Sequence, residues 1–407
     1  MLTPQLASKP GRGGGRAAIA LAGGGPLGAF FELGTLQALA ESIEGLDLND
    51  LRAYVGVSSG SMLAAGLANG LTPFDMARLV ITNESGEIGA SPSMFLHPAW
   101  REFARRAGMA PGLALRALGY YARAPLSRNM AEVLNPLTAL LPNGLFDSAP
   151  LERFLAELFS ARGRSNDFRK LGRRLYVVAT ELNTGAAARF GEPGLDDVPI
   201  SRAIQASTAL PGLYPPVEIH GAVYADGALL RTMNASLALD AGAELMICVN
   251  PLVSFDASAG GRRRPDGGLT DRGLVVVLGQ TFRSLIRSRM LVGMAGYGAR
   301  YPRADILLFE PDRDDRRMFF ANVFRYADRR RLVDHAYQRV RADLRKHADT
   351  LDVVLARHGL SLRRSVLRDR RRSFHASMEE QRRANARVAG RLGRTLKRLE
   401  RLLAERA

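Results

Sequence analysis

The sequence contains a single cysteine, Cys248, among 407 residues. One thiol cannot form a disulfide within the chain, and a metal site built from several cysteines is excluded. Histidine is also scarce: the six residues lie far apart and show no HExxH spacing. No metal or other cofactor is therefore expected, and the lack of paired cysteines fits a reducing compartment, which we take to be the cytoplasm.

The sequence also lacks convincing membrane spans and secretion signals. The stretch Ala53–Phe74 has no charged side chain over 22 residues, a length that could cross a bilayer. It contains serines, several glycines and Pro73, so we expect it to be buried within the protein. Residues 1–16 are basic but have no apolar segment of the signal-peptide kind, and we expect them to form a flexible leader.

Hydrophobic residues make up 46% of the chain and charged residues 24%. These are the proportions of an ordinary globular protein, and they exclude a disordered or fibrous chain. The net charge of +17 is unevenly placed, since Ser361–Ala407 holds 15 Lys and Arg against 5 Asp and Glu. This basic region indicates an anionic partner. Nucleic acid is not favoured, because the region lacks aromatic side chains interleaved with the basic ones.

Two successive units of strand, glycine turn and helix follow the leader. The first combines a strand at Ala17–Ala22 with a helix at Ala29–Ala40, and the second combines a strand at Arg52–Val55 with a helix at Ser61–Leu67. Repetition of this unit predicts an α/β fold with a mostly parallel sheet covered by helices. Further strands are predicted at Leu175–Ala179, Glu244–Val249 and Ile306–Phe309.

We place a main domain at residues 17–250, the range covered by the family resemblance described below. Within it, residues 95–141 are basic, apolar and broken by prolines, which predicts a helical insertion, and Asp147–Leu158 has the pattern of a helix. Residues 251–317 combine a solvated loop with elements that complete the α/β domain. Residues 318–407 are expected to form an arginine-rich helical extension without strands.

The pentapeptide Gly56-Val57-Ser58-Ser59-Gly60 fits G-x-S-x-G. In this motif a sharp turn between strand and helix lifts a serine hydroxyl above the end of a sheet, and the flanking glycines leave room for neighbouring backbone. Ser58 is therefore the candidate nucleophile. The string is short enough to arise by chance, so an ordinary glycine-bounded turn is the alternative.

A second glycine motif, Gly23-Gly24-Gly25-Pro26-Leu27-Gly28, fits G-x-G-x-x-G. A dinucleotide site would require an acidic residue closing the next strand, and the nearby Glu44 and Asp47 precede that strand instead. The other interpretation is an oxyanion hole, in which backbone N–H groups at a helix N-terminus face the charge of an acyl intermediate. The oxyanion role fits better beside a nucleophile turn, and a plain strand-to-helix turn is the remaining alternative.

A serine hydroxyl needs a base to become a nucleophile. Asp226, in Asp226-Gly227-Ala228, follows a short apolar run and is the best carboxylate, although Asp-Gly is also a common hairpin turn. A Ser/His/Asp triad in hydrolase order would add His335, which lies in a highly charged helical stretch. His220 is nearer in sequence to Asp226 but does not follow that order.

The three motifs, in this order, resemble those of the patatin-like phospholipase family. Two linking stretches are also similar to the family, Val177–Gly185 and Ala206–Val217. The resemblance covers residues 17 to 250 and implies a three-layer sandwich whose active site is a Ser/Asp dyad without metal. One departure is Leu27, because the family usually has Arg or Lys at this place in the glycine motif.

The resemblance implies a serine esterase that cleaves acyl lipids. Ser58 would attack the ester carbonyl, Asp226 would accept the proton, and the oxyanion would be held by the glycine loop. The residues implied for that loop are Gly23, Gly24, Gly25 and Gly28, with Gly56 and Gly60 shaping the nucleophile turn and Gly227 and Ala228 completing the aspartate motif. The alternative is a lipid-surface or granule-binding protein with a vestigial site, for which Leu27 is the only indication.

The end of the chain predicts a basic amphipathic helix over Glu379–Arg406. Its apolar stripe would consist of Met378, Val388, Leu392, Leu396, Leu399 and Leu403, with arginines around the rest. Such a helix can lie on an anionic bilayer, pair as a coiled coil or dock on its own domain. The first interpretation places the protein at the inner membrane surface or on lipid granules.

Overall fold

The computed structural model describes residues 1–9, 17–82, 92–123, 135–256, 271, 273–321 and 326–404. A central sheet runs in the order β1-β10-β9-β2-β4-β5-β8-β7, with β6 paired to β5. The strands are β1 (Leu2–Gln5), β10 (Asp305–Phe309), β9 (Leu245–Val249), β2 (Ala17–Leu21), β4 (Ala53–Val57), β5 (Arg174–Glu181), β8 (Ala222–Asp226), β7 (Val217–Ile219) and β6 (Ala187–Phe190). All five predicted strands are present, and no strand end differs from its predicted position by more than two residues.

The sheet is mostly parallel because its five middle strands, β10, β9, β2, β4 and β5, pair in parallel, whereas β1, β6, β7 and β8 pair antiparallel. Strand β2 shows why the middle strands are continuous apolar runs. Ile19 and Leu21 lie in one hydrophobic cluster, and Ala18 and Ala20 lie in the cluster on the opposite face. A strand buried on both faces has no place for a polar side chain.

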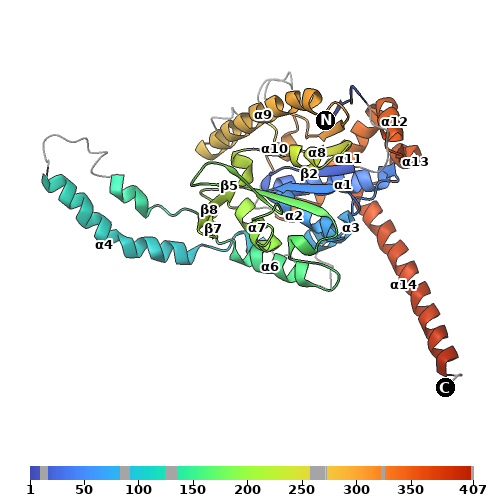
Figure 1. Ribbon diagram of the computed structural model, residues 1–407, viewed down its shortest axis with the longest axis horizontal. Coiled ribbons are helices and arrows are strands. Elements are labelled where there is room, and N and C mark those ends of the chain that lie inside the picture. Colours follow the sequence, from blue (N-terminus) through green and yellow to red (C-terminus); the bar gives the residue numbers. More distant parts are fainter. Residues whose placement is uncertain are drawn as a thin grey trace.

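Helices cover both faces of the sheet (Figure 1). Helices of the larger cluster are α1 (Gly25–Ser42), α2 (Ser59–Ala68), α3 (Pro73–Ala77), α6 (Ala149–Ser160), α7 (Ile200–Ser207), α11 (Arg329–Lys346) and α12 (Ala348–Arg357). Helices of the smaller cluster are α8 (Ser236–Asp240) and α9 (Leu274–Arg300). The predicted three-layer α/β architecture is confirmed, and the uncharged stretch Ala53–Phe74 is largely buried as β4, α2 and the start of α3.

The first residues correct the expectation of a flexible leader. Leu2–Gln5 forms β1, an edge strand that pairs antiparallel with β10, and the Leu2 side chain is buried. The buried Leu2 side chain anchors this segment, and hydrogen bonds between its backbone and the open edge of the sheet hold it as a strand. Residues 10–16 of the predicted leader lie outside the described residues.

Residues 318–407 were predicted to form a helical extension without strands, and the structure corrects this prediction: the region packs on the domain and contains a short strand. Helix α11 packs on α1, and at Gly34 the two helices approach closely. A Cβ at position 34 would collide with the backbone of Val333 and Tyr337, so only glycine allows this contact. Strand β11 (Ser361–Leu362) also pairs with β3 (Ile43–Glu44). Much of this arginine-rich segment therefore completes the core through its apolar face. The remaining short helices are α10 (Arg316–Phe319) and α13 (Arg364–Arg368).

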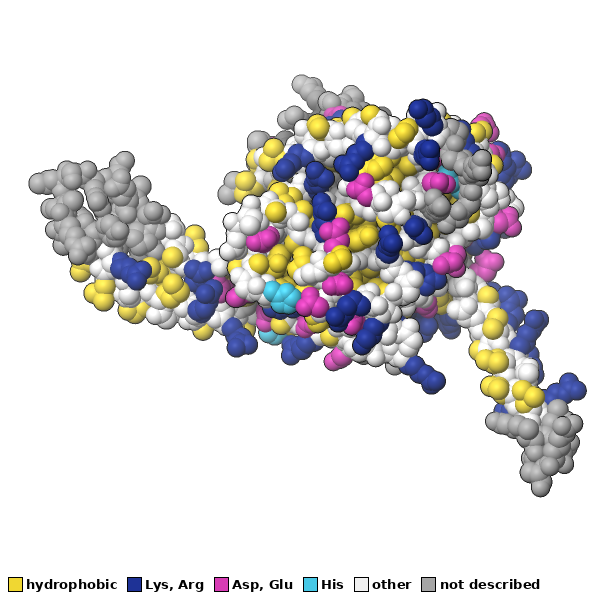
Figure 2. Space-filling view, in the orientation of Figure 1, with side chains coloured by type: hydrophobic (Ala, Val, Ile, Leu, Met, Phe, Trp, Pro, Cys, Tyr) yellow, Lys and Arg dark blue, Asp and Glu magenta, His cyan; other side chains and the backbone are white. Residues whose placement is uncertain are grey.

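Two long helices project from the body, α4 (Trp100–Arg123) and α14 (Phe374–Ala404) (Figure 1). Helix α4 confirms the helical insertion together with the short turns Pro92–Phe95 and Asn135–Leu140; residues 124–134 of that prediction lie outside the described residues, as do 257–270 of the predicted solvated loop. Figure 2 shows hydrophobic and basic side chains next to one another along both helices. None of the helices in the described ranges is long and apolar enough to span a bilayer.

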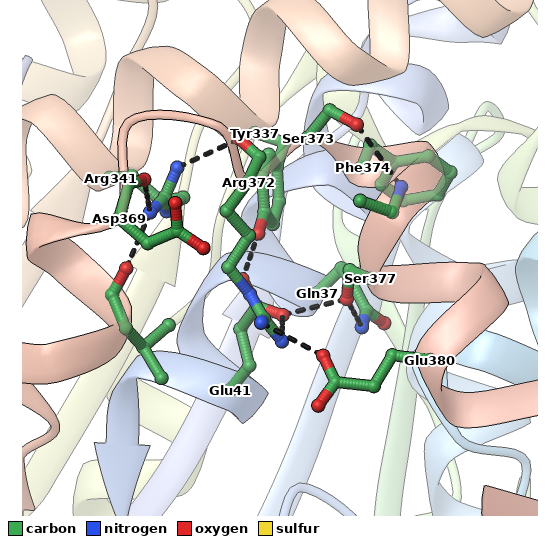
Figure 3. Close-up of polar contacts among 12 residues, drawn as sticks. Gln37, Glu41, Tyr337, Arg341, Asp369, Arg372, Ser373, Phe374, Ser377 and Glu380 are labelled. Atoms are coloured by element: carbon green, nitrogen blue, oxygen red, sulfur yellow. Dashed lines mark hydrogen bonds and ion pairs between the residues drawn. The ribbon is translucent and has the colours of Figure 1, made fainter. Parts of the chain in front are cut away.

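The base of α14 is anchored by a buried polar network (Figure 3). The carboxylate of Glu41, near the end of α1, accepts hydrogen bonds from Ser377 Oγ at 2.6 Å and Arg372 at 2.9 Å, and the Tyr337 hydroxyl also donates to it. Gln37 donates to Ser377 Oγ at 2.8 Å. These contacts attach the start of α14 to the domain.

Beyond this base, the apolar stripe of α14 faces solvent. Val388, Leu392, Leu396 and Leu399 are 67%, 58%, 50% and 50% exposed, whereas Met378 is buried. The predicted amphipathic helix is confirmed. Docking of the whole stripe on the protein's own domain is not what the structure shows, because Met378 is buried whereas the later residues of the stripe are exposed.

Candidate active site

Ser58 lies in the turn between β4 and α2, as the G-x-S-x-G spacing predicts. Its backbone has φ +50°, a conformation that L-residues rarely adopt and that surrounding structure must enforce. The flanking glycines permit the sharp turn: a Cβ on Gly56 would meet Ser61, and one on Gly60 would meet the carbonyl of Leu21. The turn is further held by Ser207, whose hydroxyl accepts a hydrogen bond from the Ser58 N–H at 2.8 Å.

Asp226 ends β8 and lies beside Ser58. Its Oδ2 accepts a hydrogen bond from Ser58 Oγ at 2.6 Å, and its Oδ1 accepts one from the Ala228 N–H at 2.8 Å. The sheet explains this proximity. Val57 pairs with Val178 on one side of β5, and Asp226 pairs with Ala179 on the other. The two side chains therefore extend from neighbouring levels of the sheet although they are far apart in sequence.

The rest of the aspartate motif provides the space for this contact. A Cβ on Gly227 would meet the carbonyl of Val178, so only glycine allows the chain to pass so close to β5. The backbone carbonyl of Asp226 accepts a hydrogen bond from Thr180 Oγ1 at 3.0 Å. The carboxylate is thus fixed from both the backbone and the side chain.

Burial dominates the electrostatics of Asp226, which is 3% exposed. Removal from water disfavours the charged form and raises the pKa of this carboxyl from 3.8 to about 6, although the hydrogen bonds from Ser58 and Ala228 act in the opposite direction. A carboxylate with a raised pKa is a stronger base than an exposed aspartate and is still mostly ionised at neutral pH.

The glycine loop Gly23–Gly28 lies next to Ser58, at the start of α1. A Cβ on Gly23 would lie 2.9 Å from the Ser58 Cβ, and Gly25 has φ +60°. The N–H groups of Gly23, Gly24 and Gly25 have no hydrogen-bond acceptor among the described residues. These donors and the helix N-terminus create a local positive potential close to the Ser58 hydroxyl.

Gly28 differs from the other predicted oxyanion residues. Its N–H donates to the carbonyl of Gly24 at 3.0 Å and belongs to the first turn of α1. A Cβ at this position would lie 2.9 Å from the Pro251 ring. Gly28 therefore allows α1 to approach the segment after β9, and the prediction of a donor at this residue is corrected. The dinucleotide interpretation also loses support, because the next strand in the sheet, β4, leads into Ser58 and not into an acidic residue.

The two histidines considered as bases contact other residues. His335 on α11 forms a hydrogen bond with Asp315 at 2.7 Å, and the exposed His220 lies 3.6 Å from Asp197. Both carboxylate oxygens of Asp226 are occupied by Ser58 and Ala228. The structure therefore does not form the Ser/His/Asp arrangement. Among the described residues, no group of three His, Cys, Asp or Glu side chains is placed to hold a metal ion.

The sequence reasoning missed Ser207, Thr180 and Pro251 as parts of the site. The Ser207 hydroxyl donates a hydrogen bond to the carbonyl of Val178 at 2.6 Å and so connects the nucleophile turn to β5. Thr180 lies in Val177–Gly185 and Ser207 lies in Ala206–Val217, the two linking stretches that resemble the family. That resemblance was the only signal in the sequence for these two residues. Pro251 had no signal, since its role depends on its packing against Gly24 and Gly28.

Comparison with known proteins places this geometry in context. The family model described as Patatin-like phospholipase matches residues 19–239, which include all three motifs. A search of the curated proteins found no match.

Solved structures with similarity include VipD from Legionella pneumophila, at 21% identity and TM-score 0.34, covering 60% of this chain and 51% of that one. Full-length ExoU from the type III secretion system of Pseudomonas aeruginosa, in complex with SpcU, matches at 15% identity and TM-score 0.27, covering 72% of this chain and 54% of that one. The chain thus spans about half the length of these two proteins.

Proposed function

Since the chain belongs to the patatin-like phospholipase family, whose model matches more than half of it, we propose that it hydrolyses acyl esters of lipids, with Ser58 as nucleophile and Asp226 as base. The observation that carries this proposal is the buried 2.6 Å hydrogen bond between Ser58 Oγ and Asp226 Oδ2. It joins a hydroxyl to a base of raised pKa directly beside backbone N–H groups that have no acceptor among the described residues. Hydrolysis of p-nitrophenyl butyrate by the full-length protein is the direct test.

The proposed reaction has two steps. Ser58 Oγ attacks the ester carbonyl while its proton passes to Asp226, and the N–H groups of Gly24 and Gly25, with Gly23 beside them, stabilise the oxyanion. Protonated Asp226 then gives the proton to the leaving alcohol, and an acyl group remains on Ser58. A water molecule attacks this acyl-enzyme, Asp226 accepts its proton, and the carboxylic acid leaves as the proton returns to Ser58.

The oxyanion donors are expected to contribute more than the base. Removal of one such donor costs about 3 to 4 kcal/mol of transition-state stabilisation in other hydrolases. The N–H donors belong to the backbone and do not depend on the side chain at position 27. Leu27, in place of the family's usual Arg or Lys, should therefore leave the oxyanion donors intact. Because the dyad contact and the loop donors are intact, a vestigial site receives no support from the geometry.

The pH dependence of turnover follows from the raised pKa of Asp226. A base acts only when deprotonated, so kcat/KM for p-nitrophenyl butyrate should rise about tenfold per pH unit below pH 6 and level off above about pH 7. The measurement is a pH–rate profile of the wild-type protein. A histidine base would give a similar curve, so the control is His335→Gln, which should keep the same inflection. A profile that is flat from pH 5 to pH 8 would contradict the role of Asp226.

We also propose that α14 binds an anionic lipid surface. Its exposed leucines and valine would enter the interfacial layer, and its arginines would contact lipid phosphates. This would hold the protein at the membrane face or on lipid granules where acyl lipids are found. A coiled coil with a second copy is the alternative, in which the same apolar stripe would pair with itself.

Truncation after Gln381 should test this role without disturbing the domain. The cut keeps the buried residues Phe374, Ser377 and Met378 and removes nine Lys and Arg with two Glu. We expect turnover of p-nitrophenyl butyrate within twofold of the full chain and at least tenfold weaker binding to phosphatidylserine vesicles in a sedimentation assay. Full-length binding should fall as salt rises, because exposed charges are screened over roughly 8 Å at physiological ionic strength.

Two matched double variants separate apolar insertion from charge. Leu392→Asp with Leu399→Asp should weaken vesicle binding more than Arg391→Gln with Arg398→Gln. Burial of the apolar side chains in the bilayer contributes more binding free energy than the attraction of two arginines to lipid phosphates. Equal vesicle binding by the full-length and truncated proteins at low salt would exclude the membrane role. Dimerisation that is lost on truncation would assign α14 to a coiled coil.

A further inference from the structure

A cavity lined almost entirely by arginines lies where α11 meets the end of α13. Its volume is about 500 Å³, and its lining residues are Gln338, Arg341, Arg345, Arg368 and Arg370. The lining contains no acidic, aromatic or aliphatic side chain. A cavity of this size can hold a small molecule. Its lining selects an anion without a large apolar part.

Arg341 is the buried member of this group, with 1% exposure. Its guanidinium donates hydrogen bonds to the carbonyls of Val366, Asp369 and Arg372 at 2.5, 2.8 and 3.1 Å (Figure 3). Its Nε has no hydrogen-bond partner among the described residues. Carbonyl oxygens satisfy N–H groups but carry no net charge. Burial therefore leaves a full positive charge that no carboxylate balances.

The other three arginines of the lining are exposed. Arg345 donates to the carbonyl of Leu367 at 2.9 Å. No ion pair within the described part of the chain involves any of the four arginines. The neighbouring Asp369 does not line the cavity, and its Oδ1 accepts the Arg371 N–H at 2.9 Å. Four positive charges thus gather without a counter-charge, and an anion bound between them relieves their repulsion.

An oligophosphate fits this lining better than a single phosphate does. The planar fork of one guanidinium binds two oxygens of a phosphate, so four guanidiniums offer more donors and more charge than one phosphate can use. One phosphate would also fill only a small part of the cavity. A nucleobase or an acyl chain would need an aromatic or apolar partner, which the lining lacks.

We propose that these five residues form a binding site for a soluble oligophosphate, a compact anion with at least two linked phosphate groups. A lipid headgroup is disfavoured by the surroundings. In residues 329–374, all of which the structure describes, the only exposed large hydrophobic side chain is Val353, so the surface around the cavity has little to insert into a bilayer. The lining residues lie outside residues 19–239, so the family match does not assign them.

Titration calorimetry of the full-length protein tests this site, with tripolyphosphate as the probe at physiological ionic strength. We expect one tripolyphosphate per chain. Orthophosphate and sulfate should bind at least tenfold more weakly, because only a linked anion reaches several arginines at once. ATP should bind no more tightly than tripolyphosphate, since no lining side chain can bind its base.

A double variant of the two exposed arginines after α11 locates the binding. Arg368→Gln with Arg370→Gln should weaken tripolyphosphate binding about tenfold to a hundredfold. The fold should be kept, because both side chains are exposed and the carbonyls that bind Arg341 remain. Thermal melting without the ligand checks this point.

The matched control is Arg391→Gln with Arg398→Gln on α14. This variant also loses two exposed arginines, but neither of them lines the cavity. It should bind tripolyphosphate within twofold of the wild type. The pair of variants therefore separates a defined site from the general attraction of a chain with a net charge of +17.

Four results would overturn the inference. The first is equal weakening of tripolyphosphate binding by the two double variants, which would show general attraction. The second is orthophosphate that binds as tightly as tripolyphosphate, and the third is ATP that binds more tightly than tripolyphosphate. The fourth is a loss on Arg368→Gln with Arg370→Gln that affects cardiolipin vesicles and not tripolyphosphate, which would assign the cavity to lipid headgroups. These measurements require no turnover, so an inactive enzyme would contradict the proposed function alone.

Discussion

Replacement of Ser58 by alanine is expected to lower kcat/KM for p-nitrophenyl butyrate by at least about 10⁴-fold, the loss seen when a hydrolase loses its nucleophile. The hydroxyl has no substitute, since the acyl-enzyme forms on Ser58 Oγ. The fold should survive, because the turn is built by Gly56, Gly60 and the Ser207 contact to the Ser58 N–H, all of which remain.

The adjacent serine provides the matched control for this variant. Ser59 is equally buried and belongs to the same motif, but its Oγ has no hydrogen-bond partner among the described residues. Ser59→Ala should therefore keep turnover within about threefold of the wild type. If Ser58→Ala retained more than a tenth of the wild-type rate, another residue would have to be the nucleophile.

Asp226→Asn should lower kcat/KM by about 10³-fold or more. The amide has the shape of the carboxylate, so its oxygen can still accept the Ala228 N–H, but it cannot accept the Ser58 proton. The remaining turnover should lose the inflection near pH 6 that the wild-type protein is expected to show. Steady-state kinetics over pH 5 to 9 measures both effects.

His335→Gln decides between the dyad and the triad in the same assay. Because His335 contacts Asp315 and not Asp226, this variant should retain the wild-type rate. A folded His335→Gln protein with a thousandfold loss would favour a triad formed in another conformation. Since Ser58 and Asp226 act in one step, the double variant Ser58→Ala with Asp226→Asn should be no less active than Ser58→Ala alone.

Several features of this protein follow from short-range patterns. The glycines at positions 56 and 60 mark a sharp turn because a side chain there would meet the neighbouring strand or helix, and that restriction depends on adjacent residues. The continuous apolar runs of the middle strands and the helical period of the α14 stripe are likewise patterns within short segments. These patterns correctly predicted the mostly parallel sheet, the turn at Ser58 and the amphipathic helix.

The prediction failed where long-range packing decided the structure. Leu2–Gln5 looked like a leader, yet an open edge of the sheet takes it up as β1. Helix α11 reads as a charged extension, with many arginines, but its narrow apolar face covers α1 and completes the core. Gly28 looked like an oxyanion donor until its N–H was found in the first turn of α1.

The sequence by itself determined the local parts: a strand, a glycine turn with a serine, a second glycine loop and an Asp-Gly-Ala turn, because each is set by sterics over a few residues. Only the tertiary structure decided that Asp226 lies on Ser58, since this requires β8 to pair antiparallel with β5 at the level where β5 pairs with β4. Such placements depend on which apolar faces bury one another across the whole chain, a sum over distant contacts that no local pattern contains.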